Sequence, residues 1–314
     1  MNDFFAGVDL GGTRSKIGLV ADGKVIARKI VPAHSAGTLD AYLPDLRNQI
    51  NQLIQEQQLP VEKLAGIGLA FPGLVDTVQK KIVHTNRKYD DAIAVDLEQW
   101  AQTNWGKSCI IDNDARMAAA GEWKYGAGKD CNDLVMVTIG TGIGTAVVMK
   151  GNLLRGKHFQ AGILGGHFSI DYEGEQCICG NTGCAEMYGG SWNLPARVKS
   201  HPLYIESLLR GYEKIDFFAV FECAKQNDAL ALHIMQQSMK AWSATISNLI
   251  LAYDPELVIL GGGVMASADI IMPYIEAQMK KQAWSPWGTV MVKKSLLQED
   301  AAILGLAHCL QELN

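Results

Sequence analysis

The sequence predicts an α/β protein of two lobes, each with a mixed sheet and helices on both sides of it. Strand-like and helix-like stretches alternate in the first third of the chain, and a similar succession returns after residue 134. A turn rich in Gly and Thr stands between two strand-like runs at the start of each succession. With 314 residues, the chain is long enough for two lobes with cores of their own.

The first succession opens with three strand-like runs joined by short turns that contain glycine, and a helical pattern follows. Two short apolar runs of the buried-strand type come next, and a helix rich in Ala and Met ends the succession. The predicted strands cover 4–10, 15–20, 24–30, 65–71 and 109–112, and the predicted helices cover 40–58 and 114–125.

The second succession has two strands around a Gly/Thr loop, one long helix, a buried strand closed by three glycines and a tail helix. Its strands are predicted over 134–139, 144–149 and 257–260, and its helices over 228–253 and 301–313. No Pro-rich linker marks a boundary. We expect a small lobe over 1–115, joined by the tail helix at about 300–314, and a large lobe over 116–299.

The composition indicates a soluble globular protein, because 48% of the residues are apolar and 19% are charged. The net charge is −5 and no basic stripe appears, so neither a nucleic acid nor an anionic membrane is an expected partner. The beginning of the chain lacks the pattern of a signal peptide, and its longest uncharged stretch is too short for a membrane helix. We expect a cytoplasmic protein.

The first Gly/Thr turn reads Asp9-Leu10-Gly11-Gly12-Thr13. Paired glycines let the backbone approach an anion, and the N–H groups of such a turn can point at phosphate oxygens. Asp9 would hold Mg²⁺ through water, and Thr13 would donate to a phosphate. The pentapeptide also suits a plain hairpin, since Gly-Gly is a common turn dipeptide.

The second turn contains Gly140, Thr141, Gly142 and Gly144. This glycine spacing differs from the dinucleotide fingerprint, and a strand rather than a helix follows, which disfavours a Rossmann dehydrogenase. Two turns of one kind predict a duplicated nucleotide-binding lobe with the phosphates of ATP held by both copies.

Three consecutive glycines, Gly261 to Gly263, follow the last buried strand. In a nucleotide-binding protein, Gly261 and Gly262 would suit a close approach of the backbone to adenine or ribose. Taken alone, the same run also suits a flexible turn.

A candidate base lies where a buried strand runs into a helix, in Asp112-Asn113-Asp114. Phosphoryl transfer to an alcohol needs a carboxylate near the attacking hydroxyl, and Asp114 at a strand's carboxyl end suits that role. Asn113 could hold a neighbouring sugar hydroxyl. Each of the three residues also suits the helix N-cap, a favoured use of Asp and Asn.

His167, Cys177, Cys179 and Cys184 form a candidate zinc site. Four ligands of this kind on a short glycine-bearing loop suit tetrahedral Zn²⁺, and a set with three thiolates leaves no open position, so the metal would be structural. Unrelated buried thiols are the alternative. Glu186 follows the last cysteine closely, so a rigid zinc loop could aim its carboxylate at sugar hydroxyls.

These motifs together resemble the ROK family of bacterial sugar kinases and repressors, within the actin-like and hexokinase-like ATPase superfamily with its ribonuclease H-like fold. The resemblance covers nearly the whole chain. It rests on the two Gly/Thr turns, Phe71-Pro72-Gly73, Asp112 to Ala115, Gly166-His167 and the block from Cys177 to Glu186.

The resemblance implies that Asp114 is the catalytic base and that Gly73, Asn113, His167 and Glu186 contact the sugar. ATP, Mg²⁺ and structural Zn²⁺ would be the cofactors, and family members are commonly dimers or tetramers. One position departs from the family pattern Gly-Glu-X-Gly-His, because Leu164 stands where the Glu is expected. The loss of that carboxylate leaves the sugar open among glucose, the N-acetylhexosamines and others.

Three hypotheses follow for the function. The first is an ATP-dependent hexose kinase, acting on a hydroxyl that we expect to be that on C6. The second is a sugar-responsive repressor, which is disfavoured because such proteins carry a helix-turn-helix domain before the first turn and only eight residues precede Asp9. The third is a non-catalytic sugar-sensing protein, which the loss at Leu164 suggests.

Overall fold

The computed structural model describes residues 3–313, which divide into two compact units. The first unit comprises the chain up to Cys131, residues 152–161 and the chain from Ser295 onward. The second comprises 132–151 and 162–294. The first unit therefore continues past the boundary expected near residue 115.

The first unit extends through α3 (Asp114–Tyr125) because this helix packs tightly along the tail helix α9 (Ala301–Gln311). Two glycines permit the close contact. A Cβ atom on Gly121 would lie 1.9 Å from the carbonyl oxygen of Ala301, and one on Gly305 would lie 1.9 Å from that of Met117. The two helices can approach this closely only where side chains are missing.

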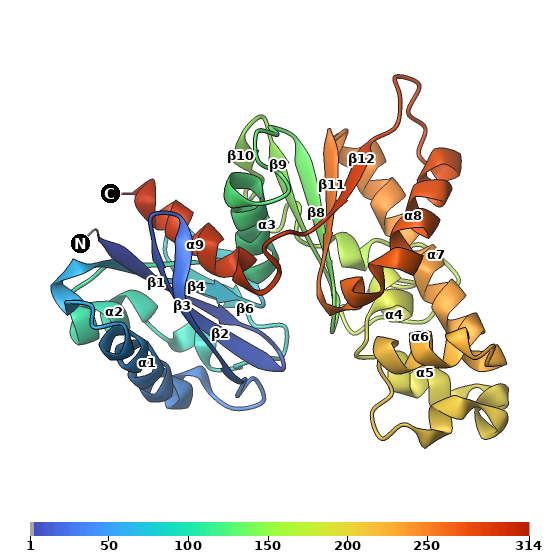
Figure 1. Cartoon of the computed structure of the whole chain (residues 1–314), viewed down its shortest axis with the longest axis horizontal. Coiled ribbons are helices and arrows are strands. Elements are labelled where there is room, and N and C mark those ends of the chain that lie inside the picture. Colours follow the sequence, from blue (N-terminus) through green and yellow to red (C-terminus); the bar gives the residue numbers. More distant parts are fainter. Residues whose placement is uncertain (1–2, 314) are drawn as a thin grey trace. The chain divides into compact units, whose positions relative to one another are not determined.

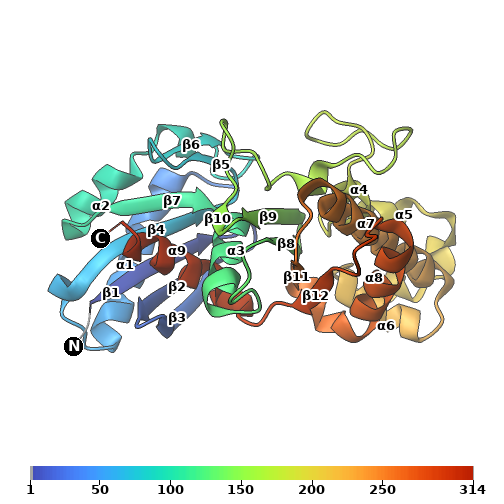
Figure 2. The same ribbon diagram turned by 90° about the horizontal axis from the view of Figure 1, so that it is seen from above.

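The sheet of the first unit has the strand order β3-β2-β1-β4-β7. The first three strands form an antiparallel meander, and β4 and β7 continue the sheet parallel to β1. The strands are β1 (Phe4–Leu10), β2 (Arg14–Ala21), β3 (Lys24–Pro32), β4 (Leu64–Phe71) and β7 (Cys109–Asn113). A small hairpin of β5 (Leu74–Asp76) and β6 (Lys81–His84) lies beside β7 (Figure 2).

Both faces of this sheet are covered, because side chains along a strand alternate between faces. Phe4, Ala6 and Val8 pack with α1 (Leu39–Glu56) and α2 (Leu97–Trp105) in one core. Phe5 packs with α3 and α9 in a second core. Figure 1 shows α1 and α9 on opposite sides of the sheet. The short strand β10 (Asn152–Leu153) also falls within the first unit.

The second unit repeats this topology. Its strands β8 (Leu134–Ile139), β9 (Ile143–Met149), β11 (Leu257–Gly261) and β12 (Met291–Lys294) have the order β9-β8-β11-β12, which corresponds to β2-β1-β4-β7. In both sheets the first two strands are antiparallel and the others run parallel to the first. The predicted duplication is confirmed.

The long helix α7 (Ala229–Tyr253) is the centre of the helical layer in the second unit. It packs against β8, and its fully buried Trp242 occupies the core. Around it lie α4 (Ala185–Gly189), α5 (Leu194–Ser200), α6 (Phe217–Lys225) and α8 (Ala268–Gln282). No helix within residues 3–313 is long and apolar enough to cross a membrane.

Each helix and strand predicted from the sequence is present, with ends that differ by a residue or two. The sequence reading left out several elements, because their patterns are short or are interrupted by Pro and polar residues. These elements are α2, α4, α5, α6, α8, β5, β6, β10 and β12.

Candidate functional site

The first Gly/Thr turn joins β1 to β2 in the first unit. The Gly11 N–H donates to the carbonyl oxygen of Arg14 at 3.1 Å, which closes the turn. A Cβ atom at Gly11 would lie 2.4 Å from that oxygen, so only glycine fits there. Thr13 is exposed at the tip, where its hydroxyl can meet a ligand. The predicted strand, turn and strand are therefore present.

Asp9 lies at the end of β1 and forms an ion pair with Lys16 (Nζ to Oδ2, 3.0 Å). Lys16 also contacts Glu299 at 3.1 Å. Burial alone would lower the pKa of Lys16, but the two carboxylates outweigh it and raise this pKa. Lys16 is thus held as a cation, and Asp9 Oδ1 has no hydrogen-bond partner among the described residues. That oxygen suits a Mg²⁺-bound water.

Asp114 begins α3 directly after β7. Its Oδ1 accepts hydrogen bonds from the Ala115 N–H at 2.8 Å and from Asn113 Nδ2 at 3.0 Å. Within residues 3–313, its Oδ2 has no partner and can receive a proton. Burial, and next the charge of Asp9, raise the pKa of Asp114 to about 6, against the opposing effects of Lys88, the Ala115 N–H and Lys16. A carboxylate tuned in this way is typical of a general base.

Asn113 is the N-cap of α3, since its Oδ1 accepts from the Arg116 N–H at 3.1 Å. Its Nδ2 donates to the carbonyl oxygen of Gly73 at 3.1 Å and to Asp114. The amide thus fixes the Gly73 turn and the Asp114 carboxylate at once. A Cβ atom at Gly73 would lie 2.1 Å from the carbonyl oxygen of His84, so this turn also requires glycine.

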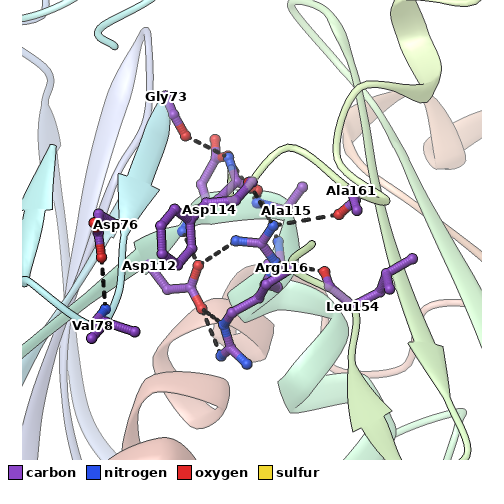
Figure 3. A network of polar contacts seen from close by, with 12 residues as sticks. Gly73, Asp76, Val78, Asp112, Asp114, Ala115, Arg116, Leu154 and Ala161 are labelled. Atoms are coloured by element: carbon purple, nitrogen blue, oxygen red, sulfur yellow. Dashed lines mark hydrogen bonds and ion pairs between the residues drawn. The ribbon is translucent and has the colours of Figure 1, made fainter. Parts of the chain in front are cut away.

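The side chain of Asp112 has a structural role, because two arginines engage its carboxylate. Its carboxylate accepts from the guanidinium of Arg116, which is fully buried, and from Arg155 at 2.8 Å. Arg116 also donates to the carbonyl oxygen of Leu154 (Figure 3) and to that of Phe159. This cluster ties the segment 152–161 to α3, because a buried guanidinium needs all of these acceptors. Of the three Asx residues, Asp114 is the one with an open oxygen.

The second Gly/Thr turn joins β8 to β9 in the second unit, and residues from a later segment of the chain form hydrogen bonds with it. Its Gly140 and Thr141 carbonyl oxygens accept from the N–H groups of Ser191 and Trp192, both at 3.0 Å. Glu186 Oε2 accepts from the Ile143 N–H at 2.8 Å.

The Glu186 carboxylate is therefore engaged on both oxygens, since Oε1 accepts from Trp192 Nε1 at 3.2 Å. A Cβ atom at Gly142 would lie 2.3 Å from Oε2, so any side chain there would displace this carboxylate. Glu186, which was predicted as a sugar ligand, thus supports the second Gly/Thr turn, a role that the sequence did not suggest. The lone pairs that remain can still accept from sugar hydroxyls.

His167, Cys177, Cys179 and Cys184 come together in the second unit, with one ligand atom of each within 4.8 Å of all the others. The Cys179 and Cys184 sulfurs are 3.6 Å apart, and His167 Nδ1 lies 3.8 Å from Cys177 Sγ. Tetrahedral Zn²⁺ with Zn–S distances of about 2.3 Å places two sulfurs about 3.8 Å apart. The three cysteines are free of disulfides, and together with His167 they fit a structural Zn²⁺.

Gly261 ends β11, and Gly262 follows with a φ of +90°. A Cβ atom at Gly262 would lie 2.2 Å from the carbonyl oxygen of Ile139, the last residue before the Gly140 turn. The glycine run therefore lies directly beside the second Gly/Thr turn. This proximity suits contact of the backbone with a nucleotide.

The structure thus groups the predicted residues by unit. The first unit gathers Asp9, Gly11, Gly12, Thr13, Gly73, Asn113 and Asp114, and the second gathers Gly140, Thr141, Gly142, His167, Cys177, Cys179, Cys184, Glu186, Gly261 and Gly262. Sequence reasoning missed Lys88, which lies against Gly12. No local motif marks this lysine.

A comparison with known protein families gives one match, to the model described as the ROK family, over residues 5–312. The chain belongs to the ROK family. This membership confirms the resemblance predicted from the motifs.

Relatives of this ROK protein include enzymes and regulators. The glucokinase of Thermotoga maritima is 32% identical, over 98% of this chain and 96% of its own. A xylose repressor of Bacillus spizizenii is 28% identical over 79% of this chain, and the match spans 62% of the repressor. The crystal structure of a ROK glucokinase from Streptomyces griseus with glucose and AMPPNP has a TM-score of 0.79 at 23% identity, over 98% of this chain and 99% of that one. The predicted two-lobed, actin-like ATPase fold is confirmed.

One feature separates this ROK chain from the family pattern. Leu164, at the expected Glu position, lies half-buried before the short 3-10 turn Gly165–His167, and its carbonyl oxygen accepts from the His167 N–H at 2.9 Å. The apolar side chain of Leu164 offers no hydrogen-bond acceptor, whereas its backbone carbonyl oxygen takes part in the turn.

Proposed function

We propose that this chain is an ATP-dependent sugar kinase that transfers the γ-phosphoryl group of ATP to the C6 hydroxyl of a free hexose. The observation that carries this proposal is Asp114, a half-buried carboxylate that begins α3 directly after β7, with Oδ2 open. Kinship with the glucokinase of Thermotoga maritima supports the reaction class and makes glucose the first candidate substrate.

In the proposed reaction, Asp114 Oδ2 accepts the proton of the attacking hydroxyl. The hydroxyl oxygen forms a bond to the γ-phosphorus as the bond from that phosphorus to the bridging oxygen breaks, and ADP leaves. The first turn (Asp9, Gly11, Gly12, Thr13) and the second (Gly140, Thr141, Gly142) would hold the phosphates, with Gly261 and Gly262 beside the nucleoside. Asp9 would hold Mg²⁺, which neutralises phosphate charge when bound.

The sugar would be held by Gly73 and Asn113 of the first unit and by His167 and Glu186 of the second. His167 would offer one ring nitrogen to Zn²⁺ and the other to the sugar, and Cys177, Cys179 and Cys184 would complete the metal site. The two units would serve as the small and large lobes. Family resemblance further supports a cytoplasmic homo-oligomer, with a dimer as the first candidate.

A coupled assay of ADP release tests this function directly. Mg-ATP is supplied with a panel of hexoses, N-acetylhexosamines and β-glucosides, and the wild type is compared with Asp114→Asn and with Asp40→Asn, an exposed aspartate of the same unit. We expect one strong substrate and a loss of about 10²-fold or more in Asp114→Asn alone. Retained turnover in Asp114→Asn would refute the base, and silence of the wild type across the panel would refute the kinase.

A second candidate is a sugar-binding protein without turnover, which Leu164 and the regulators among the relatives favour. Isothermal titration with the same sugars separates the two functions. A sugar that binds without any ADP release from Mg-ATP would support the second candidate. Binding together with release would exclude it.

A further inference from the structure

Lys88 lies against the first phosphate turn although it is remote from it in sequence. A Cβ atom built on Gly12 would meet Lys88 Cε at 3.3 Å and Nζ at 3.5 Å. Lys88 is half-buried, so its ammonium group does not simply extend into solvent. Its position places a positive charge at the turn whose N–H groups would hold phosphate.

The segment that carries Lys88 is attached to this turn by hydrogen bonds. Ser35 Oγ donates to the carbonyl oxygen of Gly12 at 2.6 Å, and the carbonyl oxygen of Ser35 accepts from the Tyr89 N–H at 2.9 Å. Tyr89 is fully buried, with its ring 6.1 Å from that of Phe71. The backbone next to Lys88 is thus anchored in the core of the first unit.

The backbone around Lys88 is strained. Asn86, Arg87 and Tyr89 have φ values of +49°, +60° and +53°, a region that residues other than glycine seldom adopt. Asn86 Nδ2 donates to the carbonyl oxygen of Pro72 at 3.4 Å, which ties this strained segment to the Gly73 turn. Strain of this kind persists where the surrounding structure enforces it, and it gathers at functional sites.

The charge of Lys88 is uncompensated by any direct partner. Lys16 is paired with Asp9 and Glu299, whereas Lys88 forms no ion pair within residues 3–313. Its charge does reach Asp114, whose ionised form it favours together with Lys16 and against Asp9. A half-buried cation without a partner lies beside the first Gly/Thr turn and acts on the charge of the candidate base, so it is placed to meet an anionic ligand.

We propose that Lys88 is a catalytic residue that contacts the transferred phosphoryl group and neutralises the charge that develops on its oxygens. The proposal rests on the proposed kinase function and adds a residue to it. Lysine serves as a point charge toward phosphate, and such a charge accelerates transfer when it is already in place before the reaction. A second effect follows, since Lys88 also helps to keep Asp114 ionised.

The test compares Lys88→Met with Lys88→Arg and with Lys81→Met, an exposed lysine on β6 that forms no ion pair in the described chain. Steady-state kinetics use Mg-ATP and the best sugar of the panel. We expect kcat to fall about 10²-fold in Lys88→Met, with little change in the KM for the sugar, and to recover partly in Lys88→Arg. The acid limb of the pH profile should move to higher pH in Lys88→Met, because Asp114 loses a favourable charge.

Two results would overturn the role of Lys88. One is a kcat of Lys88→Met equal to that of Lys81→Met. The other is a loss of kcat in both Lys88 variants together with a lower melting temperature and an unchanged acid limb of the pH profile. That result would show that Lys88 has a structural role only. Wild-type turnover is measured first. Its absence counts against the kinase, whereas an active wild type with an active Lys88→Met counts against Lys88 alone.

Discussion

Replacing Asp114 by Asn should inactivate the protein and also make its first unit more stable at neutral pH. The pKa of Asp114 is raised from 3.8 to about 6, chiefly by burial and then by the charge of Asp9. Ionising such a group costs more in the folded than in the unfolded chain, so the carboxylate destabilises the fold when it is charged. Asn has nearly the same shape and can keep the hydrogen bonds from Ala115 and Asn113, but it carries no charge.

The size and the pH range of this effect follow from the pKa. Below about pH 3 the carboxyl group is largely protonated in both states and the destabilisation is absent. It grows between about pH 3 and 6 and is complete above this range, where a pKa of about 6 corresponds to at most about 3 kcal/mol. Because Asp114 is only half-buried, solvent screening reduces this value, and we expect about 1–3 kcal/mol.

Hydrogen exchange of the β7 and α3 amides measures this difference for the first unit alone, and urea unfolding at several pH values supports it. Asp114→Asn should be more protected than the wild type at about pH 7, and the two proteins should converge near pH 3. A variant that is equally or less stable at neutral pH, or a gain independent of pH, would refute the reasoning.

Two further predictions concern the second unit. Gly142→Ala should raise the KM for Mg-ATP about tenfold, because the added methyl group would lie 2.3 Å from the Glu186 carboxylate and displace it. Gly211→Ala is the control, since there is open space around Gly211 and the KM should not change. An unchanged KM in Gly142→Ala would contradict this role for the turn. We expect one zinc ion per chain in the wild type, measured by mass spectrometry of the metal content. Cys184→Ser should lose this zinc and unfold at a lower temperature. Cys223→Ser, which changes a buried cysteine outside the candidate site, should keep its zinc. Equal zinc in both variants would exclude the proposed ligand set.

The features that the sequence predicted well are those determined by neighbouring residues. The turn at Gly11 and Gly12 follows from paired glycines between two alternating strands, and the start of α3 at Asp114 follows from a buried strand that runs into Asx residues. The duplication was predictable for the same reason, since each half repeats the local pattern of strand, turn and strand.

What the sequence could not predict depends on contacts between distant segments. Asp112 and Asp114 have similar surroundings in the sequence. Only the ion pair with the buried Arg116 shows that Asp112 has a structural role. Glu186 was predicted from its place beside the candidate zinc ligands, yet its carboxylate also accepts from the Ile143 N–H of the second Gly/Thr turn. Lys88 has no motif at all, because its position depends on the strained backbone beside it.

The two glycine turns are alike in topology but differ in the charge that supports them. The carbonyl oxygen of Gly12 accepts from the neutral hydroxyl of Ser35, and the ammonium of Lys88 lies beside this turn. The second turn is held by the carboxylate of Glu186, which occupies the Ile143 N–H. A dianionic phosphoryl group is favoured by the unpaired cation and disfavoured by the nearby carboxylate. Under the proposed function, the phosphate that reacts therefore belongs at the first turn, in the same unit as Asp114, and the second turn suits the phosphates that stay with ADP.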